Sequence, residues 1–502
     1  MVFVKISLMK GNKNMLQMTM FKKSLWYACD FLKEKIGNST YQDYIFSILL
    51  LKYVSDLKEN CAGNYFLMRD VISKIPDEAS FYHIYNKNTY STLDLGKEID
   101  NSLKLIEKAI NSVNKHSDEG LFESIQFDSI YLGGELERGS ILYELLTIFS
   151  QPEMSFSYDN SHKIRLACDF LFEKFSSDFS RRNLDISTPK CISLLIAELL
   201  QLKPREKICD PTCGSGSLLI TLGEKIQESY KSSNYELFGQ EINRSSWAIA
   251  KINMFLHNEL TSRIEWGDVI SNPKFIESDN NLMKFDVVAS NPPFNVKGWK
   301  DSDLLLDVYE RFKLGLPPQA KGDYAFILHI ISTLKDTTGR AAVLVPLGVL
   351  FRGGQELIIR KNLVEQNLLD AVIGLPDKLL SGTSIPTAIL IFKKNKKNSD
   401  IIFIDATDLG KTGRRSNTIT SDVIKKISKC YINRTEIDNF SYLANIDEIC
   451  SENDYNLNVP RYVRKDEKRV VIDFDELYKE REEMLLSLRQ LEMEINDLIQ
   501  RE

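Results

Sequence analysis

The residues Asn291-Pro292-Pro293-Phe294 combine groups that could bind a planar ring carrying an exocyclic amine. They follow an apolar run, residues 286–290, that predicts a buried parallel strand. Because two prolines fix φ and cannot donate to a sheet, the strand must end there in a stiff loop. Asn291 and the Pro292 carbonyl could accept from the amine, and Phe294 could stack on the ring. On these residues alone, a proline-terminated strand with an exposed phenylalanine stays open as the alternative.

A second group of candidate residues forms a glycine-containing turn, residues 210–217, between an apolar strand and a predicted helix. Glycines let the main chain pass close to a ligand, and the helix N-terminus offers free N–H groups. The turn could hold phosphate, but it lacks the dinucleotide and P-loop patterns. A leading aspartate would instead attract an amino group, which favours a ligand with an amino acid end. The candidate residues are Asp210, Pro211, Thr212, Gly214, Ser215 and Gly216.

Two carboxylates follow at the ends of the next predicted strands. Glu241 lies about 20–30 residues past the glycine turn, where nucleotide folds place the carboxylate that binds ribose hydroxyls. Asp268, in Gly267-Asp268, could accept from an adenine amine. Each alone is more often a helix cap or a surface charge. Together with Asn291 they predict a pocket for an adenosine that carries an amino acid.

The elements that must position these residues are visible in the hydrophobic pattern. Between residues 155 and 410, short β-branched runs alternate with longer helical ones, which predicts a mostly parallel sheet with crossover helices. Helices are expected at 217–229 and 323–335. The predicted strands are residues 207–210, 237–242, 263–267, 285–290, 341–346, 369–375, 388–392 and 401–404.

The remaining segments carry no clear chemistry. Residues 1–23 are expected to form a tail, and residues 24–150 a helical domain, because Leu25, Cys29, Leu32 and Ile36 recur at helical spacing. Residues 411–470 are expected to be an irregular connecting region that begins with a basic patch. Residues 471–502 predict a helix with a coiled-coil pattern, whose partner could be another chain or this chain's own N-terminal helices. That pattern comprises Leu477, Arg481, Met484, Leu488, Leu491, Ile495 and Leu498.

Composition narrows the class of protein. The 502 residues carry a net charge of −6, so any contact with nucleic acid must be local or shared with a partner. Eight cysteines in so long a chain do not form a disulfide framework, and Cys209 and Cys213 lack zinc-ligand spacing. No apolar run is long enough for a membrane span, and no signal peptide is recognisable. A cytoplasmic location is expected.

In the order of these motifs the chain resembles the γ-class amino-methyltransferases that use S-adenosylmethionine, and specifically the modification subunit (HsdM) of type I restriction–modification systems. The matching motifs are residues 210–216, Glu241, 267–268 and 291–294, with similar runs at 321–326, 344–346, 375–376, 382–387 and 456–462. Thr188-Pro189 resembles the segment that packs over the methionine part of the cofactor. The family usually has aromatic residues before this pair, whereas this chain has Ile186-Ser187, so a less aromatic cofactor lid is expected.

The resemblance, which runs from about residue 24 to the C-terminal helix, implies a fold and an activity. The fold is α/β: a Rossmann-like, mostly parallel methyltransferase sheet with an N-terminal helical domain and a C-terminal coiled-coil-like helix. The activity is methyl transfer to N6 of an adenine flipped out of double-stranded DNA, aided mainly by orientation. Residues 291–294 would form the catalytic group, and no metal is expected. Thr188, Pro189, Asp210, Glu241, Asp268 and Asn291 would contact the cofactor together with the glycine turn.

The family also implies partners. Two such chains would assemble with one specificity subunit, and a restriction subunit would be added for cleavage. No target-recognition domain is evident between the motifs, so sequence recognition is expected to be delegated and the C-terminal helix to dock on the specificity subunit.

Two other functions share part of the pattern. A protein glutamine methyltransferase would also need Asn-Pro-Pro to hold a planar amide. A cofactor-binding scaffold without activity is the second, and the intact Asn291 and Phe294 argue against it.

Overall fold

A mixed β-sheet with the strand order β3-β2-β1-β4-β5-β7-β6-β8-β9 forms the centre of the structure. The computed structural model describes residues 2–37, 41–60, 66–89, 92–112, 120–123, 125–157, 161–178, 188–299, 307–380, 385–413, 417–463 and 474–499. The strands are β1 (Lys207–Asp210), β2 (Glu236–Glu241), β3 (Arg263–Trp266), β4 (Val287–Ser290), β5 (Arg340–Pro346), β6 (Leu369–Gly374), β7 (Thr387–Lys393), β8 (Ile401–Asp405) and β9 (Ser441–Ala444).

The sheet is parallel from β3 to β5 and then changes direction. Strand β7 pairs antiparallel with both β5 and β6, whereas β6 pairs parallel with β8. All the predicted strands are present, and their bounds differ from the prediction by no more than two residues. The predicted α/β fold with a mostly parallel sheet is therefore confirmed. Strand β9, which pairs antiparallel with β8, was not predicted.

Helices cover both faces of the sheet. Neighbouring residues of β4 point to opposite faces, as a strand period of two requires. Val287 and Ala289 join the hydrophobic cluster that contains α8 (Lys190–Leu200), α9 (Ser217–Tyr230), α10 (Arg244–Leu256) and α13 (Ser421–Asn433). Val288 joins a second cluster that contains α11 (Asp323–Ser332) and α12 (Gln355–Glu365). The strands are buried on both faces, which explains their near-continuous apolar sequences.

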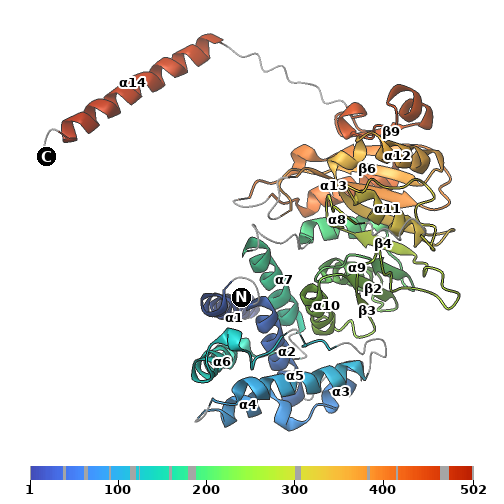
Figure 1. Ribbon diagram of the computed structural model, residues 1–502. Helices are drawn as coiled ribbons and strands as arrows, with labels where there is room; N and C mark the ends of the chain where they lie inside the picture. The colour runs from blue at the N-terminus through green and yellow to red at the C-terminus, as the bar shows by residue number, and fades with distance from the viewer. Residues whose placement is uncertain are drawn as a thin grey trace. The chain divides into compact units, whose positions relative to one another are not determined.

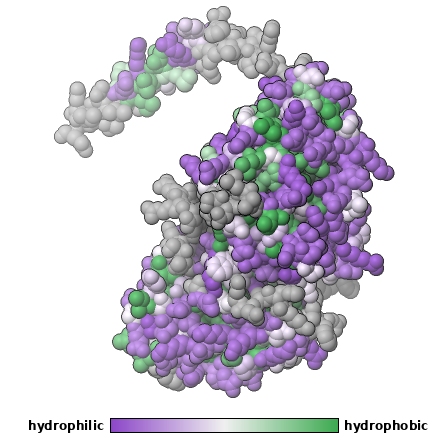
Figure 2. Space-filling model, turned by 45° about the vertical axis from the view of Figure 1, so that its right-hand side comes forward, coloured by the Kyte–Doolittle hydropathy of each residue, from purple (hydrophilic) through white to green (hydrophobic). Residues whose placement is uncertain are grey.

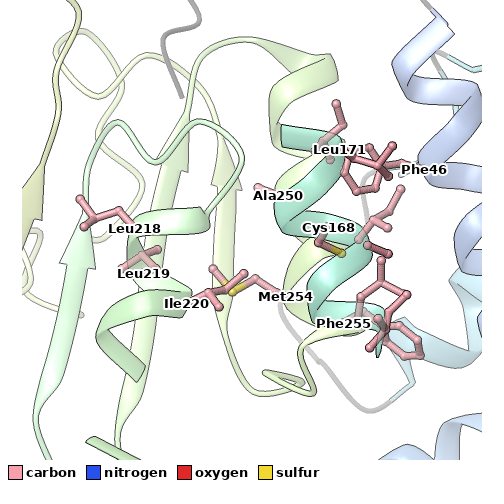
Figure 3. Packing of buried hydrophobic residues seen from close by; sticks show 14 of the residues in the cluster. Phe46, Cys168, Leu171, Leu218, Leu219, Ile220, Ala250, Met254 and Phe255 are labelled. Carbon is pink, nitrogen blue, oxygen red and sulfur yellow. The ribbon is translucent and has the colours of Figure 1, made fainter. Parts of the chain in front are cut away.

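The N-terminal part is helical, as its spacing predicts. Its helices are α1 (Val2–Ile36), α2 (Tyr41–Glu59), α3 (Phe66–Ser73), α4 (Phe81–Lys87), α5 (Leu95–Asn111) and α6 (Glu135–Phe149), followed by α7 (Ser161–Asp178). Figure 1 shows α1 to α6 together at one end of residues 1–463, with α7 and α10 between these helices and the sheet. One hydrophobic cluster continues from α1 and α2 through α7 to α9 and α10. In Figure 3, Phe46 of α2 lies beside Leu171 of α7, and Met254 and Phe255 of α10 lie close by.

The expectation of a tail at residues 1–23 is wrong, because α1 begins at Val2 and Phe21 is fully buried. Phe21 packs edge-on against Phe156 with ring centroids 6.0 Å apart. Residues 1–23 contain five Met, five Lys and no proline, and Met and Lys both favour a helix.

The expectation of an irregular connecting region at 411–470 is also wrong. Helix α13 buries Ile424, Ile427 and Tyr431 on one face, and β9 extends the sheet. The helical spacing of those apolar residues was present in the sequence but lay among many polar residues. Ile186-Ser187, residues 382–384 and the basic residues Arg414 and Arg415 fall outside the described residues.

The C-terminal residues 464–502 form a separate unit. Its helix α14 spans Phe474–Ile499, and the described side chains at the predicted coiled-coil positions Met484, Leu488 and Leu491 are all exposed. Figure 2 shows hydrophobic and hydrophilic residues side by side along this helix. None of the described helices combines the length and the apolar content that a membrane crossing requires.

Candidate active site

A cavity of about 610 Å³ lies at the carboxyl ends of β1, β2, β3 and β4. This volume is within the range of small-molecule sites, and the location is where open α/β folds bind ligands. Most of the predicted site residues line it: Thr188, Pro211, Thr212, Gly214, Ser215, Glu241, Asp268, Asn291, Pro292, Pro293 and Phe294. Pro189, Asp210 and Gly216 do not belong to the lining.

The glycine turn (residues 210–217) is held by backbone hydrogen bonds. Gly214 and Gly216 have φ of +52° and +76°, a region that favours glycine over other residues. Gly216 is the N-cap of α9, so the turn ends where the free N–H groups of the helix begin. The Gly214 N–H donates to Glu241 Oε2 over 2.9 Å, and the Cys213 N–H donates to the Gln240 carbonyl over 3.0 Å. The turn is therefore fastened to the end of β2.

Asp210 lies behind the glycine turn and does not line the cavity. Its Oδ1 accepts from the Thr212 N–H over 3.0 Å, and only 2 % of the residue is exposed. Burial raises the pKa of Asp210 to about 7, although the hydrogen bonds from Thr212 and Ser290 lower it. A positively charged group bound in front of the turn would stabilise the ionised form, so this carboxyl group suits an ammonium ligand.

The two other predicted carboxylates both reach the cavity, but each also accepts from its own loop. Glu241, at the end of β2, accepts from the Asn243 N–H over 2.7 Å with the oxygen that does not bind Gly214. Asp268, just after β3, accepts from the Ile270 N–H over 2.9 Å and from Ser271 Oγ over 2.8 Å. Asp268 thus caps a turn and not a helix, and these bonds fix its carboxylate at the cavity wall.

Residues 291–294, the amide corner, follow β4. Asn291 Nδ2 donates to Thr188 Oγ1 over 3.2 Å, so the Thr-Pro segment and the amide corner meet although they are far apart in the sequence. Pro292 is buried, and Phe294 is half-buried against the core cluster. Pro189 serves a different purpose: it is the N-cap residue of α8, and its carbonyl accepts from the N–H groups of Ile192 and Ser193.

A buried network of ion pairs and hydrogen bonds fixes the residue that follows the amide corner. Asp323, at the start of α11, accepts from the Asn295 N–H over 2.8 Å. Arg352 donates to Asp323 Oδ2 over 2.7 Å, to Asn295 Oδ1 over 3.0 Å and to Glu356 Oε1 over 3.2 Å. Asp323 and Glu356 are almost fully buried, so their charges depend on Arg352. No pattern in the sequence singled out Arg352 or Glu356.

The cavity also has a wall that the sequence did not indicate. Gln42 and Asp43 come from α2, and Phe172 and Phe175 come from α7. These residues precede the first predicted motif, and none of them belongs to a recognisable spacing. They line the cavity because α2 packs on α10, which follows directly after the Glu241 loop.

Comparisons with known proteins agree with this geometry. The N-6 DNA methylase family model matches residues 162–470, and the HsdM N-terminal domain model matches residues 21–149. The methylase subunit of the type I restriction enzyme MpnII from Mycoplasma pneumoniae is 32 % identical over 86 % of this chain and 80 % of its own length. The methylase subunit of the type I restriction enzyme MjaVIII from Methanocaldococcus jannaschii is 33 % identical, over 80 % of this chain and 72 % of its own length.

A solved structure is similar along its whole length. The type I restriction-modification system methyltransferase subunit from Streptococcus thermophilus has a TM-score of 0.75 and 28 % sequence identity, with 89 % of this chain and 100 % of that chain covered. The relatives favour a DNA methylase over the protein methyltransferase alternative. The chain therefore belongs to the N-6 DNA methylase family, among the methylase subunits of type I restriction–modification systems.

Proposed function

We propose that this chain transfers the methyl group of S-adenosylmethionine to N6 of an adenine in double-stranded DNA, as an adenine-specific DNA methyltransferase. A separate specificity subunit supplies the sequence recognition. The observation that supports this proposal most directly is that the carboxylates Glu241 and Asp268 and the amide corner line the same cavity. The proposed nucleoside site and the proposed site for a planar amine therefore share one cavity.

The residues present fit S-adenosylmethionine at three points. The ribose hydroxyls would donate to Glu241 and the adenine amine to Asp268, while the methionine ammonium would lie in front of the glycine turn and Asp210. The buried Asp210, whose pKa is raised to about 7, supplies a reason for the cavity to favour a ligand with a positive charge. The bound cofactor supplies an electrophilic methyl group on a sulfonium.

The amide corner would hold the target base. A stacked adenine cannot reach the cavity, so the base must be flipped out of the duplex, at a cost of a few kcal/mol. Asn291 Oδ1 and the Pro292 carbonyl would accept hydrogen bonds from the two N–H groups of the amine, which directs the nitrogen lone pair toward the methyl group. Phe294 would stack on the ring. The amine nitrogen would be the nucleophile: its new bond to the methyl carbon forms as the carbon–sulfur bond breaks, and it then loses one proton to water. The residues would act by orientation, which can lower a barrier substantially without a nucleophilic side chain.

Substitution of Asn291 tests the reaction directly. In the complex with the specificity subunit, Asn291→Ala is expected to lower methyl transfer to duplex DNA by about 100-fold or more, since one oriented acceptor of the amine is lost. Labelled cofactor and isolation of N6-methyladenine give the measurement. Asn234→Ala, at an exposed asparagine before β2, is the matched control. Label found in protein instead of DNA would contradict the proposal.

The partners belong to the same proposal. We assign residues 471–502 to docking on the specificity subunit, with a second copy of this chain and a restriction subunit completing the assembly. The exposed Met484, Leu488 and Leu491 of α14 are the observation in favour, because unpaired apolar positions at coiled-coil spacing favour a partner helix.

Deletion of residues 471–502 tests the docking. The truncated chain is expected to lose co-purification with the specificity subunit but to keep binding of S-adenosylhomocysteine, since the cavity lies within residues 1–463. A double variant, Leu488→Asp with Leu491→Asp, should have the same effect in the full-length chain. Unchanged complex formation in both would contradict the assignment.

A further inference from the structure

Two side chains of the N-terminal helices lie in the wall of the proposed cofactor cavity, although no motif includes them. Gln42 and Asp43 belong to the first turn of α2. We propose that Asp43 is a cofactor-binding residue that accepts a hydrogen bond from a ribose hydroxyl, so that the N-terminal helices complete the cofactor site. This inference rests on the proposed function and extends it to a part of the chain outside the methyltransferase sheet.

Asp43 is held against the start of α10, next to the loop that carries Glu241. Asp43 Oδ1 accepts from Ser245 Oγ over 2.6 Å. Ser245 lies in the first turn of α10, immediately beyond the loop that carries Glu241 and Asn243, and Ser245, Asn243 and Glu241 all line the cavity. Asp43 is thus fixed by a residue four positions after Glu241, and both carboxylates line the same cavity.

The surroundings of Asp43 favour a ligand that donates hydrogen bonds to its carboxylate. Burial raises its pKa to about 6, and the hydrogen bond from Ser245 lowers it only in part. Among the described residues no lysine, arginine or histidine forms an ion pair with it. A partly buried carboxylate without a cation is costly unless further donors reach it. Ribose hydroxyls are such donors, and the cavity is the side from which they can approach.

Gln42 gives a third observation from the same turn. Its Nε2 atom is buried and has no hydrogen-bond partner within the described residues. Buried side-chain donors in folded proteins are normally satisfied, and an exception calls for a specific explanation. Gln42 also lines the cavity, although its Nε2 atom is not itself exposed there, so an acceptor on the bound ligand would satisfy this donor only after the side chain turns toward the cavity.

Contacts between the start of α10 and the N-terminal part of the chain explain why α2 lies so close to the cavity. Arg244, next to Ser245, donates to Glu123 Oε2 over 2.6 Å and to the Gly120 carbonyl over 3.2 Å. The start of α10 therefore contacts both α2 and the turn after α5, and the Asp43 contact lies at the cavity. Figure 3 shows the apolar packing of α2, α7 and α10 that supports this arrangement. Glu123, whose side chain is 69 % exposed, offers a matched control.

Calorimetric titration of the full-length chain with S-adenosylhomocysteine tests the inference. Asp43→Asn is expected to weaken binding by about tenfold, since a hydrogen bond to a charged acceptor is lost. Glu123→Gln, which breaks the other contact, should bind like the wild type. Ser245→Ala is the second variant, should Asp43→Asn fail to fold, and is expected to weaken binding by about threefold because the carboxylate loses its fixed orientation. Wild-type affinity in the folded Asp43 and Ser245 variants would overturn the inference.

A shorter ligand tests the assignment to ribose. Methylthioadenosine keeps the ribose and the adenine but lacks the amino acid. The loss of affinity caused by Asp43→Asn should be as large for this ligand as for S-adenosylhomocysteine. Disappearance of the loss would overturn the ribose contact, because Asp43 would then bind the ammonium. Absence of any binding to the wild-type chain would be a failure of the proposed function instead.

Discussion

The glycine turn and the amide corner lie in the same cavity, but they are held in place in different ways. The glycine turn is fixed by its neighbours: Gly214 donates to Glu241, and Cys213 donates to Gln240, all at the ends of β1 and β2. The amide corner is fixed by residues that lie outside the sheet. Its Asn291 contacts Thr188, and the residue that follows the corner, Asn295, is bound by Asp323 and Arg352.

This difference separates the two proposed functions of the cavity, which are cofactor binding and orientation of the target base. In the proposed function, cofactor binding would depend on backbone groups and on adjacent strands, which are parts of one parallel sheet. Orientation of the target base would depend on the ion-pair network between α11 and α12 and on Thr188, two residues before α8. Substitutions can therefore be chosen to disturb orientation without binding, or binding without orientation.

The largest effect is expected at Arg352. Arg352→Met removes the cation that holds Asp323, Glu356 and Asn295, so the loop after the amide corner loses its support. We expect methyl transfer to fall by about 100-fold, since a displacement of about 1 Å at a reacting group has this order of effect. Affinity for S-adenosylhomocysteine should be unchanged. Single-turnover methylation and calorimetric titration separate the two quantities.

Stability provides the control for this variant. Two nearly buried carboxylates lose their partner, so the free energy of unfolding should fall by about 3–5 kcal/mol. Arg352→Lys keeps the charge but cannot reach all three partners, and it should lie between the wild type and Arg352→Met. Lys361→Met, which breaks the half-exposed pair with Glu365 on the same helix, should leave both rate and stability nearly unchanged. A loss of cofactor affinity equal to the loss of rate would contradict the proposed separation.

A smaller effect, on binding alone, is expected at Gly214. Its φ of +52° strains any other residue, but an added Cβ would meet no atom within 4 Å. Gly214→Ala should therefore cost about 1 kcal/mol of stability through backbone strain. It should also weaken cofactor binding by about tenfold, since the new methyl group lies at the ligand surface. Calorimetric titration gives the affinity and thermal unfolding gives the stability.

Gly216→Ala is the matched control for the glycine turn. Gly216 also has a positive φ, of +76°, but it does not line the cavity. Its added Cβ would come within 2.9 Å of the flexible end of Met254 and would make ordinary contacts with Ala250, at 3.6 and 3.8 Å. The loss of stability should resemble that of Gly214→Ala, while cofactor affinity stays near the wild-type value. Equal losses of affinity in the two variants would show that strain, and not contact with the ligand, determines binding.

The same contrast explains what the sequence could predict. The strands and the glycine turn were predictable because their signals are local: apolar runs ended by glycine, proline or a carboxylate. Asn291 and Phe294 were recognisable because two prolines isolate them at a strand end. Arg352, Asp43 and Gln42 were not, since Arg352 reaches the loop after the amide corner, and Asp43 and Gln42 reach the cavity, only through tertiary packing.

Helix α13 and strand β9 show a different reason for failure. The apolar residues of α13 recur at helical spacing, but many polar residues surround them and masked the period. Strand β9 is only four residues long, Ser441–Ala444, and is half exposed at the edge of the sheet. Short edge strands carry little sequence signal because they bury only part of one face.

The last expected effect is a pH dependence of cofactor affinity. The pKa of Asp210 is raised to about 7 by burial, and this carboxyl group lies behind the glycine turn, where it accepts from Ser290, the residue before the amide corner. As the pH falls from 8 to 6 the carboxyl group becomes neutral and loses its attraction for an ammonium group. Affinity for S-adenosylhomocysteine should then fall by about tenfold, because at most one proton is linked to binding.

Stability of the unliganded chain should respond in the opposite direction. The folded chain holds the Asp210 proton up to about pH 7, whereas an unfolded chain releases it near the ordinary aspartate pKa of 3.8. The contribution of Asp210 to the free energy of unfolding is therefore lost as the pH rises from about 4 to 7. Asp210→Asn should flatten both dependences, in calorimetric titration and in urea unfolding. If affinity in this variant kept its full pH dependence, the ammonium site would have to lie elsewhere in the cavity.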